Sequence, residues 1–223
     1  MKSTKDIALI IESLNNDKVV IIPTDTIYGY SCKIDSILAI DEIRDLKKRD
    51  RNKPFLILDS NLDRVRNYFA ENDNTNSLTN KLIDKLIKEK IWPNNLTLIS
   101  DKNPDLNKFS FLQNLGTVAV RYTDNKIIQK ITDNLGCGIL STSINVSGEK
   151  ELISYFNIFE KFKNTEEIIF ILETNNRNEN NLNSTIIKLD KSLNNDDLLQ
   201  MIRKGDSNIV KKVNLIIESK YLI

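Results

Sequence analysis

The 223-residue sequence contains no histidine. Without imidazole, the chain can form neither a Ser-His-Asp nor a Cys-His catalytic arrangement, and no zinc site that uses histidine. It has only two cysteines, Cys32 and Cys137, too few for a disulfide framework or a cysteine metal site. An enzyme of this composition works without histidine as acid or base. Reactions that depend on positioning and charge neutralisation remain open, and phosphoryl and nucleotidyl transfer lead that group.

Long apolar runs are also missing. None approaches the roughly 18 residues needed to span a bilayer, and the first residues mix charged and apolar side chains, unlike a signal or transit peptide. We therefore expect no membrane association and a cytoplasmic location. The formal net charge is +1, with 40% hydrophobic and 28% charged residues. These values are typical of a globular protein that can bury a core.

Hydrophobic periodicity predicts an α/β fold. Apolar spacing of three to four residues predicts helices at 3–14, 36–48, 77–90, 126–135, 152–163 and 196–204. Short β-branched runs predict strands at 18–24, 54–58, 96–100, 117–122, 138–143, 166–172 and 184–189. Several runs are apolar at consecutive positions, which indicates that both faces of the sheet are covered. We expect a mixed sheet with flanking helices in one domain of residues 1–205. A short tail, 206–223, would pack on that domain or add an edge strand.

A dense run of positive charge stands out in "LKKRDRNKP". The cations are Lys47, Lys48, Arg49, Arg51 and Lys53. Cations at a helix C-terminus complement the helix dipole, which explains Lys47 and Lys48 but not the cations beyond the predicted helix. Clustered like charges repel unless an anion neutralises them, and a polyphosphate matches such a density. A solvated helix end and an anion site both remain open for this run.

Three other segments place polar groups where a strand opens into a loop, a common position for ligands in open α/β sheets. "PTDTIYG" carries Thr26, "TVAVRYT" carries Arg121, and "GILSTSINVSGE" carries Ser143 and Asn145. An arginine at the end of an apolar strand needs a partner, either a ligand carboxylate or the nearby Asp124. Hydroxyl and amide groups suit phosphate oxygens, a ribose or a base edge, although a plain turn and a Ser/Thr-rich loop are the alternatives.

In their order along the chain, seven segments resemble the successive motifs of one family. They are "IIPTDTIYG", "LKKRDRNKP", "WPNNLTLI", "TVAVRYTD", "ILSTSINVSGE", "NSTIIKL" and "IRKG". Together they resemble the YrdC-like family, whose members are threonylcarbamoyl-AMP synthases, over nearly the whole chain. Each segment alone is a modest signal, and the strength lies in their common order. The chain resembles the short, single-domain, TsaC-like branch.

The resemblance implies a twisted α/β sheet around a large, concave, basic cavity. It also implies a nucleotidyltransferase that condenses L-threonine, bicarbonate and ATP to threonylcarbamoyl-AMP and releases pyrophosphate. Downstream proteins would then carry the group to adenosine 37 of tRNAs, forming N6-threonylcarbamoyladenosine (t6A), and tRNA itself is a further candidate partner. Mg²⁺ would be held mainly by the phosphates of ATP, and no residue of the chain is assigned as a metal ligand.

The resemblance also assigns site residues. Lys47 and Arg49 would be catalytic, because they would neutralise the triphosphate and the leaving group. The expected threonine contacts are Thr26, Arg121, Ser143 and Ser184. The expected nucleotide contacts are Arg49, Lys53, Thr117, Asn145, Ser154 and Arg203. Five residues, Asp25, Ser31, Asn94, Asn95 and Ile144, differ from those usual in the family.

Two other functions compete with this interpretation. A basic concavity on an α/β domain would also suit an RNA-binding module that acts on tRNA or the ribosome without turnover. The balanced overall charge and the lack of aromatic residues within the cationic run argue against it. A carbamoyl-transfer domain is the third option, but such domains occur in longer chains.

Overall fold

The computed structural model describes residues 2–51, 53–70, 77–164, 170–172, 183–192 and 198–219. The strands are β1 (Lys2–Thr4), β2 (Val20–Ile22), β3 (Gly29–Lys33), β4 (Leu56–Asp59), β5 (Leu96–Asp101), β6 (Thr117–Tyr122), β7 (Ile139–Ser143), β8 (Phe170–Leu172), β9 (Thr185–Leu189) and β10 (Leu199–Arg203). The helices are α1 (Ile7–Asn15), α2 (Ile37–Lys47), α3 (Leu62–Asn67), α4 (Leu78–Lys88), α5 (Lys126–Leu135), α6 (Tyr155–Phe162) and α7 (Ser207–Glu218), with 3₁₀ turns η1 (Pro104–Lys108) and η2 (Ser110–Leu112).

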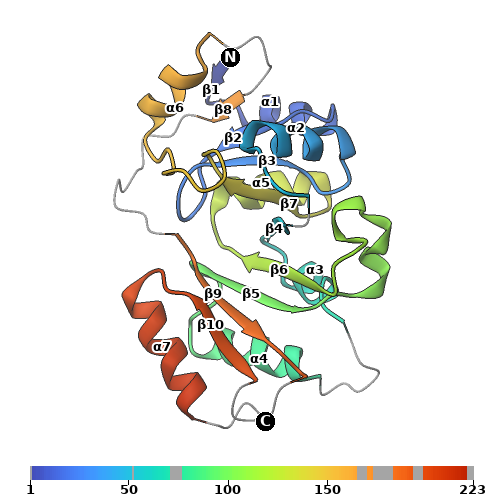
Figure 1. Cartoon of the computed structure of the whole chain (residues 1–223), viewed down its shortest axis with the longest axis vertical. Coiled ribbons are helices and arrows are strands. Elements are labelled where there is room, and N and C mark those ends of the chain that lie inside the picture. The colour runs from blue at the N-terminus through green and yellow to red at the C-terminus, as the bar shows by residue number, and fades with distance from the viewer. Residues whose placement is uncertain are drawn as a thin grey trace.

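The strands form one mixed sheet of ten strands within the described residues, in the order β1-β8-β2-β3-β7-β4-β6-β5-β9-β10. Its pairs are both parallel, as in β4 with β6, and antiparallel, as in β3 with β7. The sheet extends along the long axis of the molecule, from β1 at one end to β10 and α7 at the other (Figure 1). The predicted mixed sheet with flanking helices is confirmed. No helix in the described ranges is long and apolar enough to cross a membrane.

Most predicted elements are present, but the C-terminal part differs. The helix predicted at 196–204 is wrong, because residues 199–203 form β10, which pairs antiparallel with β9. A short apolar run fits either period, and here pairing with β9 decides. The alternative of an edge strand after residue 205 is also wrong. Helix α7 occupies that stretch and buries Ile209, Val213 and Ile216 in the larger core.

Two further strands, β1 and β3, and two helices, α3 and α7, were not predicted, nor were the 3₁₀ turns η1 and η2. The helix predicted at 3–14 begins only at Ile7, because the Asp6 carboxylate caps its first turn and residues 2–4 pair as β1. Strand β3 is short and rich in polar and small residues, so it lacks the β-branched signal that marks its neighbours. The Asn-rich stretch at 173–181, whose composition predicts a loop, lies outside the described residues.

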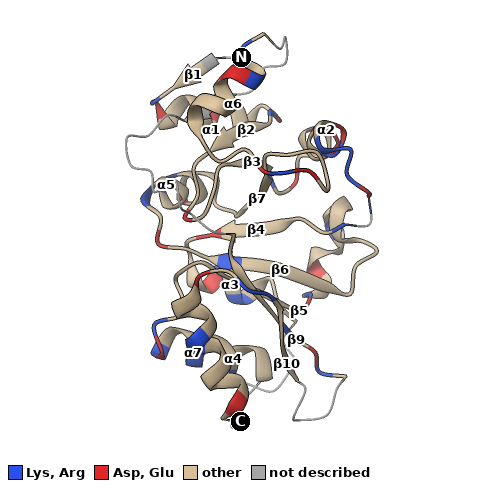
Figure 2. Cartoon of the chain, turned by 60° about the vertical axis from the view of Figure 1, so that its left-hand side comes forward, with Lys and Arg blue, Asp and Glu red and all other residues tan. Residues whose placement is uncertain are grey.

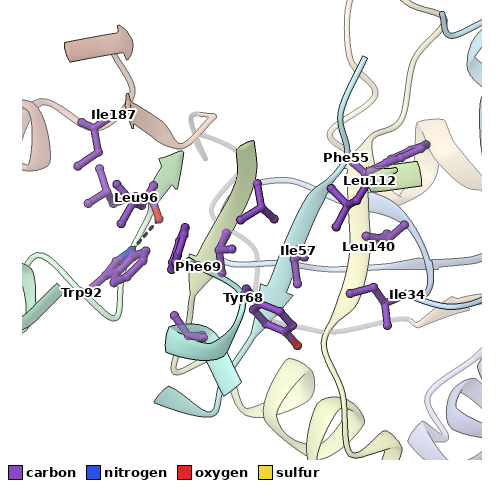
Figure 3. Packing of buried hydrophobic residues seen from close by; sticks show 14 of the residues in the cluster. Ile34, Phe55, Ile57, Tyr68, Phe69, Trp92, Leu96, Leu112, Leu140 and Ile187 are labelled. Atoms are coloured by element: carbon purple, nitrogen blue, oxygen red, sulfur yellow. Dashed lines mark hydrogen bonds between the residues drawn. The ribbon is translucent and has the colours of Figure 1, made fainter. Parts of the chain in front are cut away.

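Alternate residues of the central strands face two apolar cores. In β4, Ile57 belongs to the larger core and Leu58 to the smaller one; in β7, Leu140 and Ile139 divide in the same way. Figure 3 shows part of the larger core, where the indole nitrogen of Trp92 donates to the carbonyl of Leu96 at 2.8 Å. Both faces are therefore buried at the centre of the sheet, as the consecutive apolar residues predicted.

The smaller core covers only part of its face. Helices α1 and α5 supply its helical members, which pack on β2, β4 and β7. Leu56 lies two residues before Leu58 in β4, so the two side chains point to the same side of the strand. Leu56 pairs with Ala119 of β6 and with Ser141 of β7. These three residues lie on the part of the face next to the α1–α5 layer, and they line the cavity described below.

A buried carboxylate at the end of β4 joins several elements. Asp59 is fully buried and accepts hydrogen bonds from Arg64 at 2.8 Å and from the Tyr68 hydroxyl at 2.7 Å. The same hydroxyl accepts the backbone N–H of Gly138, where a Cβ would lie 2.8 Å from it. Burial, with the adjacent carboxylate, raises the pKa of Tyr68, so the neutral phenol donates to Asp59. Arg64 also pairs with Asp133 of α5, and the network ties α3 and α5 to the sheet.

We predict that Asp59→Ala lowers the free energy of unfolding by about 3 kcal/mol, because it removes one partner of a buried ion pair and leaves the Tyr68 hydroxyl without its acceptor. The control is Asp84→Ala, whose carboxylate is 69% exposed in its pair with Arg66 and should cost less than about 1 kcal/mol. Urea unfolding followed by circular dichroism measures both. Equal losses in the two variants would contradict the prediction.

Candidate functional site

A cavity of about 280 Å³ lies against the sheet, next to the α1–α5 layer. It is lined by residues of β3, β4, β5, β6, β7, β9 and β10, of the loops that follow β2 and β7, of the segment between α2 and β4 and of the residues just before β9. The predicted site residues that line it are Thr26, Arg49, Arg121, Ser143, Ser184 and Arg203. Segments separated by more than 150 residues therefore meet here. Three arginines and one carboxylate, Glu151, supply the charged groups of its described lining, while a large, concave, basic surface stays a prediction.

Arg121 is the most deeply placed charge in the cavity. The β6 residues Thr117, Ala119 and Arg121 share one side of the strand, and Arg121 is only 4% exposed. Its guanidinium donates to the hydroxyl of Thr26 at 3.0 Å and lies 3.5 Å from that of Thr97. Among the described residues it has no carboxylate at ion-pair distance, so Asp124 is not its partner. Burial lowers the pKa of Arg121, and the negative charge of Asp25 opposes that shift.

The loop between β2 and β3 is held by its own polar groups. The Thr24 hydroxyl donates to the carbonyl of Ile27 at 2.7 Å and lies 3.1 Å from the Thr26 hydroxyl. One carboxylate oxygen of Asp25 accepts from Thr123 at 2.7 Å, while the other is buried with no hydrogen-bond partner in the described structure. The Asp25–Thr123 bond fastens this loop to the end of β6, and so places Thr26 beside Arg121.

A second hydroxyl pair links the start of β9 to β5. The hydroxyls of Thr97 and Ser184, both almost fully buried, lie 2.9 Å apart, and Arg203 donates to the Ser184 hydroxyl at 3.0 Å and to its carbonyl at 2.9 Å. Gly205 lets the chain after β10 approach this point, because a Cβ there would lie 2.2 Å from the carbonyl oxygen of Asn183. The weak "IRKG" signal in the sequence therefore marks a real close approach.

The cationic run divides between the cavity and solvent. Arg49 lines the cavity, donates to the carbonyl of Pro54 at 2.7 Å and lies 5.2 Å over the ring of Phe55. Burial lowers the pKa of Arg49, and the charge of Arg44 lowers it further. The other cations after Lys47, namely Lys48, Arg51 and Lys53, are exposed. Figure 2 shows the positive charge along the segment that leaves α2.

Lys47 is 1% exposed and points into the loop after β7. Its ammonium donates to the carbonyl of Ser143 and, at 2.6 Å, to the side-chain oxygen of Asn145, which also accepts from the Ser143 hydroxyl at 2.8 Å. Burial, with the charge of Arg49, lowers the pKa of Lys47 from 10.5 to about 8. Lys47 thus holds the loop that carries Ser143 and Asn145, and it is not itself among the residues that line the cavity.

The remaining predicted residues are not among those that line the cavity. Lys53 is exposed, Thr117 lies on the strand side shared with Arg121, and the Ser154 hydroxyl caps α6 by accepting the N–H of Asn157. Ile144, which differs from the residue usual in the family, is fully buried in the larger core and is not among the residues that line the cavity.

The cavity residues that the sequence patterns did not single out include Phe55, Thr97, Glu151 and Asn183. Thr97 is a polar residue within the apolar run "LTLIS", which was the one available signal. Glu151 accepts from the side-chain amide of Asn183 at 2.8 Å. As the single carboxylate in the described lining, Glu151 offers one ligand for a divalent cation, and no group of three metal-ligating residues occurs in the described ranges.

Comparison with known proteins places most of the sequence in one family. The family model Sua5_yciO_yrdC, described as "Telomere recombination", matches residues 12–205. The threonylcarbamoyl-AMP synthase of Wigglesworthia glossinidia brevipalpis is 32% identical over 145 residues, which are 65% of this chain and 71% of that protein. The synthase of Vibrio campbellii is 25% identical over 175 residues, which are 78% of this chain and 91% of that protein.

A solved structure shares the fold. P. abyssi Sua5, crystallised in complex with L-threonine, aligns with a TM-score of 0.73 and 22% sequence identity. The alignment covers 93% of this chain and spans 57% of that longer chain. At this identity the likeness concerns the fold alone, whereas the family model covers most of the sequence. The chain belongs to the Sua5/YciO/YrdC family.

Proposed function

We propose that the protein is an L-threonylcarbamoyladenylate synthase, a nucleotidyltransferase that condenses L-threonine, bicarbonate and ATP and releases pyrophosphate. Its catalytic domain would be residues 1–205, with residues 206–223 packed on it. The relatives named threonylcarbamoyl-AMP synthase support this proposal. The observation that carries it is the buried Arg121 guanidinium, which meets hydroxyls but no described carboxylate in a cavity large enough for an amino acid.

A buried guanidinium is costly unless a carboxylate or phosphate satisfies it, and its planar fork matches a carboxylate well. Arg121 would bind the carboxylate of L-threonine, with Thr26, Ser143 and Ser184 around the rest of that substrate. Arg203, which is held by Ser184, would contact the bound nucleotide. The amine nitrogen attacks the carbon of bicarbonate, water leaves, and a carbamate forms. No histidine is needed if the substrates exchange these protons themselves.

The carbamate oxygen then attacks the α-phosphorus of ATP, and the bond to pyrophosphate breaks. Arg49 lies at the cavity with its guanidinium fixed over Phe55, where it would neutralise the triphosphate and the leaving group. Lys47 would add charge from behind the loop while it holds Asn145, our proposed nucleotide contact. Lys53, Thr117 and Ser154 remain further proposed nucleotide contacts. Mg²⁺, bound mainly by the phosphates with at most Glu151 from the described lining, would supply charge neutralisation.

The product would serve t6A formation at position 37 of tRNAs through downstream transfer proteins, and the reaction would take place in the cytoplasm. Pyrophosphate release measured with each amino acid, with and without bicarbonate, tests the reaction. Release that requires both L-threonine and bicarbonate is expected. Salt-sensitive binding of RNA without any turnover would instead favour the RNA-binding module.

We predict that Arg121→Lys raises the KM for L-threonine by about tenfold or more with little change in the KM for ATP, because lysine keeps the charge but loses the bidentate fork. Initial rates of pyrophosphate release at varied L-threonine and varied ATP measure the two constants. A change confined to the KM for ATP would place Arg121 at the nucleotide instead.

Arg49→Ala should keep the fold and lower the rate of synthesis by about 10²–10³-fold, since it removes one charge that stabilises the leaving pyrophosphate. Arg51→Ala is the matched control, because Arg51 belongs to the same run but is exposed, and its rate should stay near that of the wild type. Near-wild-type pyrophosphate release by Arg49→Ala, with an unchanged melting temperature, would refute the assignment.

Lys47 should impose an alkaline limit on activity. Its pKa of about 8 means that kcat/KM falls as the pH rises through 8, because neutral Lys47 loses the charge that holds Asn145. Over the same range the unfolded chain binds this proton more tightly, so the contribution of Lys47 to stability rises between about pH 8 and 10.5. The lost activity is therefore not unfolding. The ratio of wild-type to Lys47→Met activity between pH 6.5 and 9.5 isolates this effect from the substrate chemistry, and a flat ratio would contradict it.

A further inference from the structure

The hydroxyl of Thr26 retains no proton for a ligand. The Thr24 hydroxyl donates its single proton to the carbonyl of Ile27 at 2.7 Å. The 3.1 Å bond between the two threonine hydroxyls must therefore be donated by Thr26. Thr26 already accepts one hydrogen bond from Arg121 at 3.0 Å. Because a hydroxyl has one proton and two lone pairs, Thr26 keeps one lone pair for a ligand.

The pair formed by Thr97 and Ser184 differs from Thr26, because it has a hydroxyl proton to spare for a ligand. Thr97 receives the Nε–H of Arg121 at 3.5 Å, and Ser184 receives Arg203 at 3.0 Å. The two hydroxyls share one bond at 2.9 Å. Whichever of them donates it, one hydroxyl proton of the pair stays available. The cavity thus presents an acceptor at Thr26 and a donor at the Thr97–Ser184 pair.

We propose that Thr24 is a positioning residue that makes Thr26 an acceptor for an N–H group, and thereby selects a carboxylate ligand that carries an α-amine. This inference rests on the proposed function, in which Arg121 binds the carboxylate of L-threonine. The amine and the carboxylate of an amino acid are attached to one carbon atom, and the Thr26 hydroxyl lies 3.0 Å from the guanidinium. An amine therefore comes within reach of Thr26 when the carboxylate lies on Arg121.

The arrangement also suits the first bond-forming step. When the neutral amine donates an N–H to Thr26, its lone pair is not used in that contact and remains for attack on bicarbonate. A ligand group that can only accept a hydrogen bond finds no proton at Thr26. Selection against such ligands arises because a buried polar group left unpaired is costly.

The test measures Kd by isothermal titration calorimetry for L-threonine and for 3-hydroxybutanoate, which lacks the amine. The wild type should bind the amine-free ligand about tenfold more weakly or worse. Thr24→Val keeps the shape but frees the proton of Thr26, so the ratio of the two Kd values should fall by about tenfold. Thr24→Ser keeps the hydroxyl and should retain the wild-type ratio.

Thr97→Val is the matched control, because it removes a cavity hydroxyl that does not bond to Thr26, and it should leave the ratio unchanged. Equal weakening of both ligands in Thr24→Val, or a Thr24→Ser ratio as low as that of Thr24→Val, would show a packing role only and overturn the inference. Absence of L-threonine binding to the wild type would refute the proposed function itself. L-Threonine binding with an unchanged Thr24→Val ratio would refute this inference alone.

A ligand series on the wild type decides the matter if Thr24→Val does not fold. The analogue in which the α-amine is replaced by a methoxy group can only accept hydrogen bonds at that position. It should bind no better than 3-hydroxybutanoate. Tighter binding of the methoxy analogue would mean that Thr26 donates a proton, and would overturn the inference.

Discussion

The central constraint in this molecule is the incomplete cover on one face of its sheet. Helices α1 and α5 pack on β2, β4 and β7 with a small apolar core, and the same strands continue past that core with Leu56 and Ser141. The opposite face carries the larger core, which buries the alternate residues. Because a strand alternates its side chains, polar residues can line the cavity while their neighbours stabilise the fold.

Within that cavity the buried charge of Arg121 organises the polar groups around it. Thr26 and Thr97 both lie within hydrogen-bond distance of its guanidinium, and each connects to a further hydroxyl. A neutral hydroxyl is a weaker acceptor for a guanidinium than a carboxylate is. A carboxylate ligand therefore gains more binding free energy at Arg121 than it would at an exposed arginine. Because the cavity is buried and its dielectric constant is low, the direction in which each hydroxyl proton points affects which ligands bind.

The cationic run shows how one sequence feature can serve two purposes. Lys47 lies inside the protein, where its bonds to Ser143 and Asn145 replace lost hydration. Arg49 lies at the cavity, and the exposed Arg51 and Lys53 face solvent. These cations are close in sequence but differ in environment, because the chain turns as it leaves α2 at Lys48, a residue with a left-handed backbone at φ 46°. Charge density alone did not distinguish these positions.

The sequence by itself determined the α/β class, most of the central strands and helix α5 to the residue, because the apolar period is a local signal. Six of the residues that line the cavity were expected through the resemblance of its ordered motifs to one family. Only the tertiary structure decided that residues 199–203 pair with β9 rather than form a helix, and that Thr97 and Glu151 join the cavity. It also placed Lys47 behind the loop instead of in the lining. Those outcomes depend on contacts between distant segments, and no local pattern of residues encodes them.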